Sequence, residues 1–152
     1  MKKKAIVVVG ATASGKTALG VHIAQKFNGE VISADSMQIY KGMDIATAKP
    51  TKEEQQGIVH HMMDFLDSSE QFSVARYCDM THDIIRDIHS RGKLPVLVGG
   101  TGLYVDSLIN NITFSDSEGD DNLREKVFDF IYKYRYPLSV IVIAVCVIFQ
   151  IH

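Results

Sequence analysis

A run of small residues near the start of the chain has the residue types and spacing needed to bind phosphate. Residues 10–17 have the sequence GATASGKT, which matches the pattern G-x-x-x-x-G-K-[ST]. Glycines let backbone N–H groups curl around phosphate oxygens, and the N-terminus of a following helix adds a favourable dipole. Lys16 would bring a positive charge to the terminal phosphates, and Thr17 has a hydroxyl of the kind that binds Mg²⁺. The segment predicts a site for a phosphate chain rather than a merely structural glycine turn.

Two further candidate groups follow predicted strands. Asp35 ends the apolar segment VISAD, and three roles stay open for it: a helix-capping or loop carboxylate, a Mg²⁺ ligand, or a general base facing the phosphate loop. Thr101 lies in the sequence GGTG over residues 99–102 and could donate to a phosphate oxygen. The alternative for this second group is a tight strand-to-helix turn. Residue type alone does not choose between these roles.

Strands and helices alternate along the chain. Short β-branched runs predict buried strands at residues 5–9, 30–33 and 94–100. Apolar residues at helical spacing predict one helix that begins near residue 15 and others over residues 72–91, 101–109 and 123–134. Ser73 is the expected N-cap of the second of these helices, and a capping box at residues 51–54 predicts the start of a further short helix. Residues 115–121 are polar and predict a loop. The pattern predicts an α/β fold, a P-loop NTPase-like parallel sheet flanked by helices. The carboxyl ends of its strands would bring the candidate residues together.

Composition limits the classes of partner. The chain has 152 residues with 16 Lys and Arg and 18 Asp and Glu, so it lacks the overall basic excess typical of nucleic-acid binding, and any RNA contact must be local. Cys78 and Cys146 form no disulfide framework, which favours a reducing cytoplasm. The histidines show no metal-binding pattern, so we expect the His60–His61 pair to be a polar turn or a packing element.

The last seventeen residues differ from the rest of the chain. Residues 136–152 contain no Asp, Glu, Lys or Arg. They are too few and too β-branched to favour a membrane helix, which needs about 20 apolar residues. We therefore divide the chain into a P-loop core at residues 1–135 and an apolar tail at residues 136–152. A buried strand is one reading of the tail, but we expect it to be foreign to the fold and, if exposed, prone to aggregation.

Several segments taken together resemble one known family. They are GATASGKTALG, VISADSMQIYKGMDIATAKP, HHMMDFLD, FSVARY and GKLPVLVGGTGLY, in that order. Over about residues 4–126 the chain resembles the tRNA dimethylallyltransferases, also called tRNA isopentenyltransferases. The phosphate loop is shared by many families, but SADSMQIYKGMDIATAKP followed by VGGTGLY is specific to this one.

The resemblance implies transfer of a dimethylallyl group from dimethylallyl diphosphate to the exocyclic amine of the adenosine 3′ of the anticodon in tRNA. It implies that the donor diphosphate is bound by Gly10, Ala11, Thr12, Ala13, Ser14, Gly15, Lys16 and Thr17. Mg²⁺ would be bound at Thr17, Asp35 would be the general base, and Thr101 would lie beside the reacting centre. It further implies that tRNA is contacted by Asp35, Ser36, Met37, Gln38, Thr101 and Arg124.

Members of this family are longer than this chain and carry an additional RNA-binding domain. We therefore expect the fold to be incomplete at its C-terminus, the transfer activity to be impaired and the anticodon stem-loop of tRNA to bind weakly. We also expect a monomer without membrane association. Two alternatives are a small P-loop kinase acting on a nucleotide or small molecule, and an inactive phosphate-binding remnant. The kinase would need arginines to clamp the transferred group, and residues 42–67 contain none.

Overall fold

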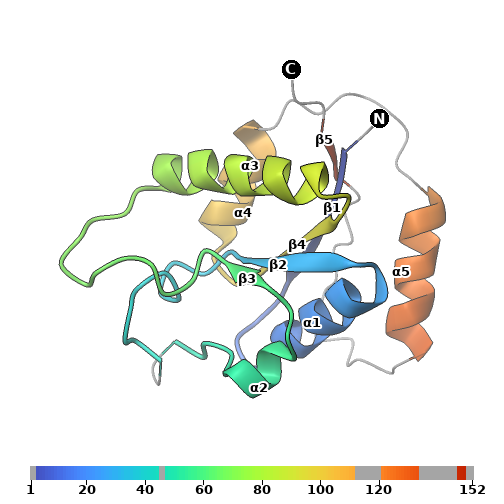
Figure 1. Ribbon diagram of the computed structural model, residues 1–152, viewed down its shortest axis with the longest axis horizontal. Coiled ribbons are helices and arrows are strands. Elements are labelled where there is room, and N and C mark those ends of the chain that lie inside the picture. Colours follow the sequence, from blue (N-terminus) through green and yellow to red (C-terminus); the bar gives the residue numbers. More distant parts are fainter. Residues whose placement is uncertain (1–2, 45–46, 112–120, 134–146, 150–152) are drawn as a thin grey trace.

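The computed structural model describes residues 3–44, 47–111, 121–133 and 147–149 (Figure 1). The described strands are β1 (Lys3–Val9), β2 (Gly29–Ser33), β3 (His60–His61), β4 (Leu94–Gly99) and β5 (Val147–Phe149). The described helices are α1 (Lys16–Lys26), α2 (Lys52–Gln55), α3 (Val74–Ser90), α4 (Gly102–Asn111) and α5 (Asp121–Lys133).

The strands form one sheet in the order β3-β2-β4-β1-β5. The pairs β2–β3, β2–β4 and β1–β4 are parallel, which confirms the predicted α/β architecture. The central strands β1, β2 and β4 are rich in Val and Ile and are buried on both faces, as strands of a parallel sheet between helices must be. Because β1, β2 and β4 run in the same direction, the turns that follow them gather at one edge of the sheet (Figure 1).

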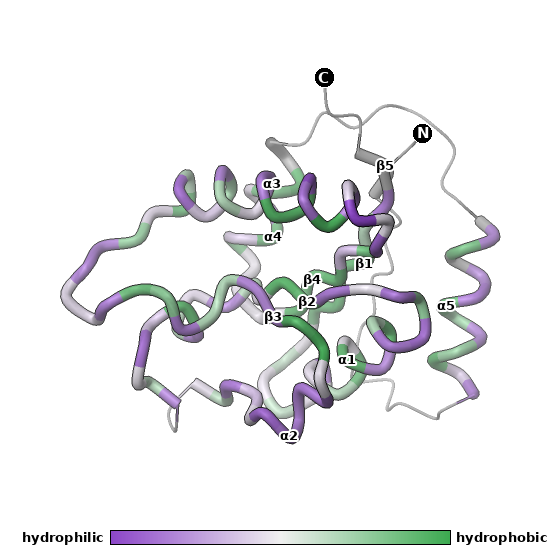
Figure 2. Tube along the Cα trace, in the orientation of Figure 1, coloured by the Kyte–Doolittle hydropathy of each residue, from purple (hydrophilic) through white to green (hydrophobic). Residues whose placement is uncertain are grey.

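Side chains that alternate along the strands build two apolar layers, one on each face of the sheet. Helices α3 and α4 cover one face and α1 and α5 the other (Figure 1). Hydrophobic residues follow the strands and the sheet-facing side of α3, whereas α2 is hydrophilic (Figure 2). The first layer includes Ala5, Val7, Ile32, Leu97, Tyr77, Ile85 and Leu108. The second includes Ile6, Val8, Val31, Val96, Leu19, Ile23 and Val127.

The helix ends follow the signals in the sequence. The Ser73 side chain accepts a hydrogen bond from the N–H of Arg76 and caps α3, and Gly92 follows that helix with a φ of 69°. Thr51 and Glu54 form the predicted capping box at the start of α2. These caps confirm the sequence prediction of both helices.

Two predictions in the middle of the chain need correction. We expected a polar turn or a packing element at His60–His61, and the turn is wrong: the pair forms the short strand β3, whose backbone pairs with Val31 and Ile32 of β2. The packing alternative agrees with the contact of His61 with Glu30 at 2.7 Å. The predicted loop at residues 115–121 ends one residue early, because α5 begins at Asp121; residues 112–120 lie outside the described part of the chain.

The apolar tail contributes to the sheet. We expected it to be foreign to the fold, but residues 147–149 form β5, which pairs antiparallel with β1 at Lys3, Lys4 and Ala5. β5 thus covers the β1 edge with backbone hydrogen bonds. The rest of the tail falls outside the described residues. Among the described helices, none is both long and apolar enough to cross a bilayer.

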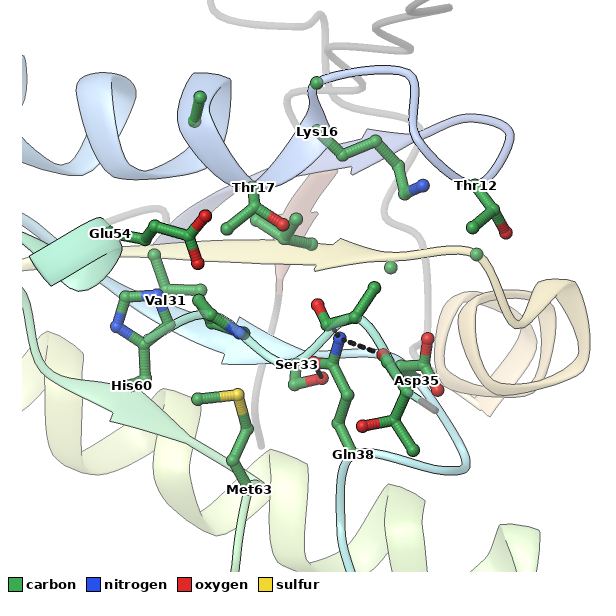
Figure 3. Close-up of a pocket in the computed structure, with 18 of the residues that line it drawn as sticks. Thr12, Lys16, Thr17, Val31, Ser33, Asp35, Gln38, Glu54, His60 and Met63 are labelled. Carbon is green, nitrogen blue, oxygen red and sulfur yellow. Dashed lines mark hydrogen bonds between the residues drawn. The ribbon is translucent and has the colours of Figure 1, made fainter. Parts of the chain in front are cut away.

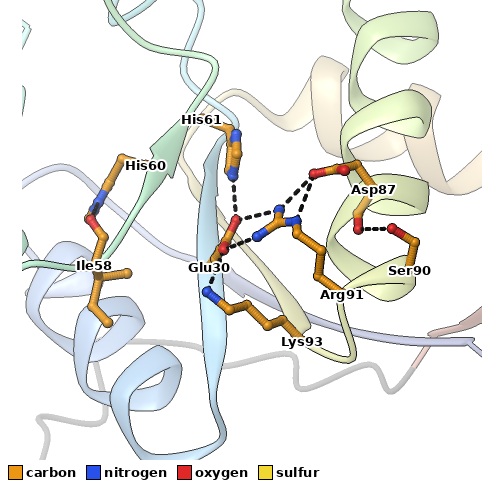
Figure 4. A network of polar contacts seen from close by, with 8 residues as sticks. All are labelled: Glu30, Ile58, His60, His61, Asp87, Ser90, Arg91 and Lys93. Carbon is orange, nitrogen blue, oxygen red and sulfur yellow. Dashed lines mark hydrogen bonds and ion pairs between the residues drawn. The ribbon is translucent and has the colours of Figure 1, made fainter.

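A charged network joins β2, β3 and the turn between α3 and β4 (Figure 4). Glu30 is only 1% exposed, and its carboxylate accepts hydrogen bonds from Arg91 Nη2 at 2.8 Å, Lys93 Nζ at 2.7 Å and His61 Nε2 at 2.7 Å. Arg91 also binds Asp87, four residues earlier. The Arg91 guanidinium, with Lys93 and His61, holds the pKa of Glu30 well below its usual range. The network keeps a buried carboxylate ionised and fixes β3 to the sheet.

Candidate functional site

The phosphate loop lies between the end of β1 and the start of α1. Its backbone needs the left-handed region at Gly15 (φ 88°), where glycine is the residue that fits without cost, and at Ala13 (φ 60°). A Cβ on Gly10 would lie 3.1 Å from Ser14 Oγ, so a side chain there would crowd the loop. Within the described structure the buried Oγ of Ser14 has no hydrogen-bond partner. An unpaired buried hydroxyl in such a loop is suited to meet an oxygen of a bound anion.

Lys16 begins α1 and turns back over the loop. Its Nζ donates a hydrogen bond to the carbonyl oxygen of Ala11 at 2.6 Å. Burial lowers the pKa of Lys16, and the negative charge of Asp35 partly offsets that shift. Lys16 and Asp35, the carboxylate after β2, both line one pocket.

This pocket has a volume of about 520 Å³, a size typical of small-ligand sites (Figure 3). The phosphate loop and the start of α1 form one wall, from Thr12 to Ala18. The end of β2 and the segment after it lie opposite, with Ser33, Asp35 and Gln38. The remaining lining residues include Val31, Pro50, Glu54, His60 and Met63, so an apolar region adjoins the polar one.

Asp35 is oriented by its own turn. Its Oδ1 accepts a hydrogen bond from the backbone N–H of Met37 at 2.9 Å, and the side chain lines the pocket. The sequence left loop-capping, metal-binding and proton-accepting roles open. The hydrogen bond from Met37 gives Asp35 the loop-capping role. The metal-binding and proton-accepting roles stay open, because the turn holds only one of the two carboxylate oxygens.

Thr101 lies beside the same turn, just after β4. Its Oγ1 accepts a hydrogen bond from the N–H of Ser36 at 3.1 Å, and its own N–H donates to the carbonyl oxygen of Ala34 at 3.2 Å. The strand ends approach so closely here that a Cβ on Gly99 would lie 2.2 Å from that same Ala34 oxygen. The glycine at residue 99 therefore allows β2 and β4 to bring Asp35 and Thr101 together, as the sequence predicts.

Gln38 is held on both sides of its amide. The Ser33 hydroxyl donates to Gln38 Oε1 at 2.8 Å, and Gln38 Nε2 donates to the carbonyl oxygens of Thr47 and Ala48, each at 3.3 Å. Sequence reasoning singled out Gln38 but missed Ser33. The missed signal was strand alternation, which puts Ser33 and Asp35 on the same side of the chain at the end of β2.

Several predicted site residues are thus brought together, and one is not described. Residues 12–17 of the phosphate loop, Asp35 and Gln38 line one pocket, and Thr101 lies next to it; the predicted residues Gly10 and Ala11 are not among those that line the pocket. Met37 also lines the pocket and is 46% exposed. Arg124 belongs to α5, and its side chain lies outside the described part of the structure, so its predicted role as a tRNA contact stays a prediction.

Sequence comparison gives one family. The profile of the family described as IPP transferase matches residues 38–136. The tRNA dimethylallyltransferase of Caldanaerobacter subterraneus subsp. tengcongensis is 59% identical over 122 residues, which are 80% of this chain and 39% of that protein. The tRNA dimethylallyltransferase of Halalkalibacterium halodurans is 50% identical over 134 residues, or 88% of this chain and 43% of that protein.

Solved structures agree. The full-length tRNA isopentenylpyrophosphate transferase from Bacillus halodurans superposes with a TM-score of 0.71 at 49% identity, covering 88% of this chain and 44% of that one. A eukaryotic dimethylallyltransferase acting on tRNA gives a TM-score of 0.70 at 36% identity, covering 90% of this chain and 39% of the other. The chain thus spans 39–44% of the length of these relatives.

Proposed function

This chain belongs to the IPP transferase family, and on that premise we propose that it acts in the transfer of a dimethylallyl group from dimethylallyl diphosphate to an adenosine of tRNA. The target is the exocyclic amine of the adenosine 3′ of the anticodon. The observation that carries this proposal is that a single pocket joins a phosphate-binding loop to the carboxylate of Asp35. The loop alone would suit any phosphate ligand, but its position opposite a carboxylate suits a reaction at the carbon next to the diphosphate.

The loop would hold the diphosphate as a leaving group. Backbone N–H groups within residues 12–17, the Ser14 hydroxyl and the Lys16 ammonium can stabilise charge that develops on the phosphate oxygens as the carbon–oxygen bond breaks. No phosphoryl group is transferred in this scheme. The apolar residues Val31 and Met63, on the far side of the pocket, offer contacts for the hydrocarbon part of a ligand.

Asp35 would accept the proton. An adenine exocyclic amine is a poor nucleophile, so a positioned carboxylate that removes its proton assists the attack. The turn fixes Oδ1 through the Met37 N–H, which leaves Oδ2 as the oxygen able to take that proton. Thr101 would steady this geometry through the N–H of Ser36, next to Asp35.

Mg²⁺ is the cofactor we propose, and the donor set can be tested against it. Thr17 lines the pocket and offers a hydroxyl oxygen. Within the described residues, no cluster of three or more His, Cys, Asp or Glu side chains could hold a metal ion. The Thr17 hydroxyl beside the phosphate loop suits Mg²⁺, which commonly binds through one or two protein ligands together with substrate phosphates and water. When bound, the ion would neutralise charge on the departing diphosphate.

The tRNA substrate is the anticodon stem-loop, and the adenine must leave its stack to reach the pocket. Ser36 and Met37 lie next to Asp35 and would contact the RNA there. The formal net charge of −2 provides no general attraction for RNA, so we propose weak tRNA binding by this chain. We further propose that it is a monomer, and a tRNA substrate would place it in the cytoplasm.

A kinase is not favoured. Phosphoryl transfer commonly uses arginine to stabilise the transferred group. Among the described residues that line the pocket, the cation of the loop is Lys16 and no arginine is present.

A labelled transfer experiment tests the proposal. The protein, dimethylallyl diphosphate with a labelled prenyl group, Mg²⁺ and a saturating anticodon stem-loop are incubated, and the RNA is digested to nucleosides. We expect the label on one adenosine, and a loss of about a hundredfold or more in rate for Asp35→Asn, the usual contribution of a general base. The matched control Asp67→Asn makes the same change at an exposed carboxylate outside the pocket and should retain most of the rate. Labelling that is equal in Asp35→Asn and wild type would contradict the assigned base.

A further inference from the structure

The lysine at residue 49 is buried although it lies in a loop. Its side chain is 4% exposed, and its ammonium group has three hydrogens to place. They are donated to the carbonyl oxygen of Tyr40 at 2.9 Å, to Asp44 Oδ1 at 2.8 Å and to the carboxylate of Asp64. Burial lowers the pKa of Lys49, but the two carboxylates together raise it by more, so the net shift is upward and the group stays charged. The lysine therefore ties three separate points of the chain together.

The points that Lys49 joins surround Gln38. The residue before the lysine, Ala48, has a φ of 47°, a left-handed conformation that is uncommon for alanine, and its carbonyl oxygen accepts from Gln38 Nε2. Asp64, which Lys49 binds, donates its backbone N–H to the carbonyl oxygen of Gln38 at 3.1 Å. Lys49 thus stabilises both the segment that holds the side chain of Gln38 and the segment that holds its backbone.

The hydrogen bonds determine which way the Gln38 amide faces. Carbonyl oxygens only accept, so the two that face the amide, from Thr47 and Ala48, require Nε2 on that side. Both hydrogens of Nε2 are then used, and Oε1 accepts from Ser33 with one of its two lone pairs. Because Gln38 lines the pocket, what its amide can offer a ligand is a hydrogen-bond acceptor.

From these contacts we infer that Lys49 is a positioning residue that fixes Gln38 as an acceptor, so that the pocket selects a base with an exocyclic N–H donor over one with a carbonyl at the same place. The inference deepens the proposed function and depends on it only for the identity of the base. The chemical contrast is that between adenine, which has an amine at this position, and hypoxanthine, which has a carbonyl.

The first measurement needs no ligand. The side-chain NH₂ signals of Gln38 are assigned by NMR with the help of a Gln38→Leu variant, and their exchange with solvent is followed. In Lys49→Met we expect exchange to be about tenfold faster, the factor that corresponds to losing one charge-assisted hydrogen bond. The matched control is Lys41→Met, which removes the same charge from the same loop, where Lys41 is 53% exposed and pairs with Asp67 at 3.5 Å. That control should leave the Gln38 signals unchanged.

The second measurement tests selection. Adenosine and inosine are titrated into protein saturated with inorganic diphosphate and Mg²⁺. Wild type and Lys41→Met should prefer adenosine by about tenfold, the cost of an unpaired buried polar group. Lys49→Met should lose this preference and keep its affinity for diphosphate. If Lys49→Met does not fold, Asp44→Asn removes one partner of the lysine at a side chain that is 69% exposed, and both readouts should move in the same direction by a smaller factor.

Each outcome is decisive. Unchanged Gln38 exchange in Lys49→Met and in Asp44→Asn overturns the positioning role. Equal binding of adenosine and inosine by wild type overturns the acceptor role, even if the amide is held. Failure of wild type to bind either nucleoside counts against the adenosine substrate of the proposed function, while the exchange data still decide the positioning role.

Discussion

The close approach of β2 and β4 at Gly99 leads to a sharp prediction. In Gly99→Ala the new Cβ would lie 2.2 Å from the Ala34 carbonyl oxygen, which belongs to the backbone and cannot rotate away. The two strand ends must therefore separate by about 1 Å to reach an ordinary contact. That movement breaks the hydrogen bonds from Ala34 N–H to Val98 (2.8 Å) and from Thr101 N–H to Ala34 (3.2 Å).

The size of the effect follows from these losses. Two backbone hydrogen bonds contribute about 1 kcal/mol each, and overpacking costs about 1–3 kcal/mol, so we expect a loss of about 3–5 kcal/mol. For a chain of this length that corresponds to a fall in Tm of about 10 °C. Urea denaturation and thermal melting, both followed by circular dichroism, measure the two quantities. Diphosphate binding should also weaken, because the Gly99 backbone lines the pocket.

The neighbouring glycine provides the control. A Cβ on Gly100 would lie 3.6 Å from the Gly10 carbonyl oxygen and 4.0 Å from Lys16 Nζ, which are ordinary contacts. Gly100→Ala should therefore be within about 1 kcal/mol of wild type. If Gly99→Ala were as stable as wild type, or if both variants lost the same stability, the argument from the strand contact would be refuted.

Three further variants test other parts of the structure. Lys16→Met should abolish measurable binding of inorganic diphosphate in calorimetry while leaving Tm nearly unchanged, and retained binding would show that the loop is not the phosphate site. Glu30→Gln should destabilise the protein by about 2 kcal/mol at pH 7 in urea titrations, less than the roughly 3–5 kcal/mol of a fully buried pair because Arg91 and Lys93 are partly exposed. Since the pKa of Glu30 is lower in the folded state than its ordinary value of 4.5, its contribution is present above that pH and is lost as the pH falls below it. The stability gap between Glu30→Gln and wild type should therefore narrow in acid, and a gap that is constant from pH 7 to pH 3 would contradict the ionised network. Ser73→Ala should cost about 1 kcal/mol through loss of the α3 cap, measured by the same titrations, and an unchanged midpoint would show that the cap contributes nothing.

The layers of the fold could be predicted because local sequence patterns encode the strands and helices that form them. Buried parallel strands require β-branched runs, and Ser73 and Thr51 mark helix starts through hydrogen bonds to backbone N–H groups only three residues away. Strand β3 was missed because His60 and His61 are two residues with no apolar alternation, and their strand conformation depends on pairing with β2. The strand conformation of β5 likewise depends on pairing, in this case with β1 at the other end of the chain.

The candidate site likewise has residues that local sequence patterns predict and contacts that they do not. The phosphate loop could be found from its own spacing, and Asp35 and Thr101 from their places after parallel strands. The hydrogen bonds that orient Gln38 could not be predicted. Its partners Thr47 and Ala48 are positioned by Lys49, which binds Asp64, fifteen residues after the lysine. Such contacts require knowledge of how the loop folds back on itself, and nothing in the spacing of these residues indicates it.

A competition titration tests whether the phosphate loop holds the diphosphate of a prenyl donor. Dimethylallyl diphosphate and ATP are titrated against each other in the presence of Mg²⁺, with Lys16→Met as the variant in which both should fail to bind. We expect the prenyl diphosphate to displace ATP and to bind at least about tenfold more tightly, because the apolar side of the pocket adds contacts with Val31 and Met63. Tighter binding of ATP, or no binding of the prenyl diphosphate to wild type, would contradict this prediction.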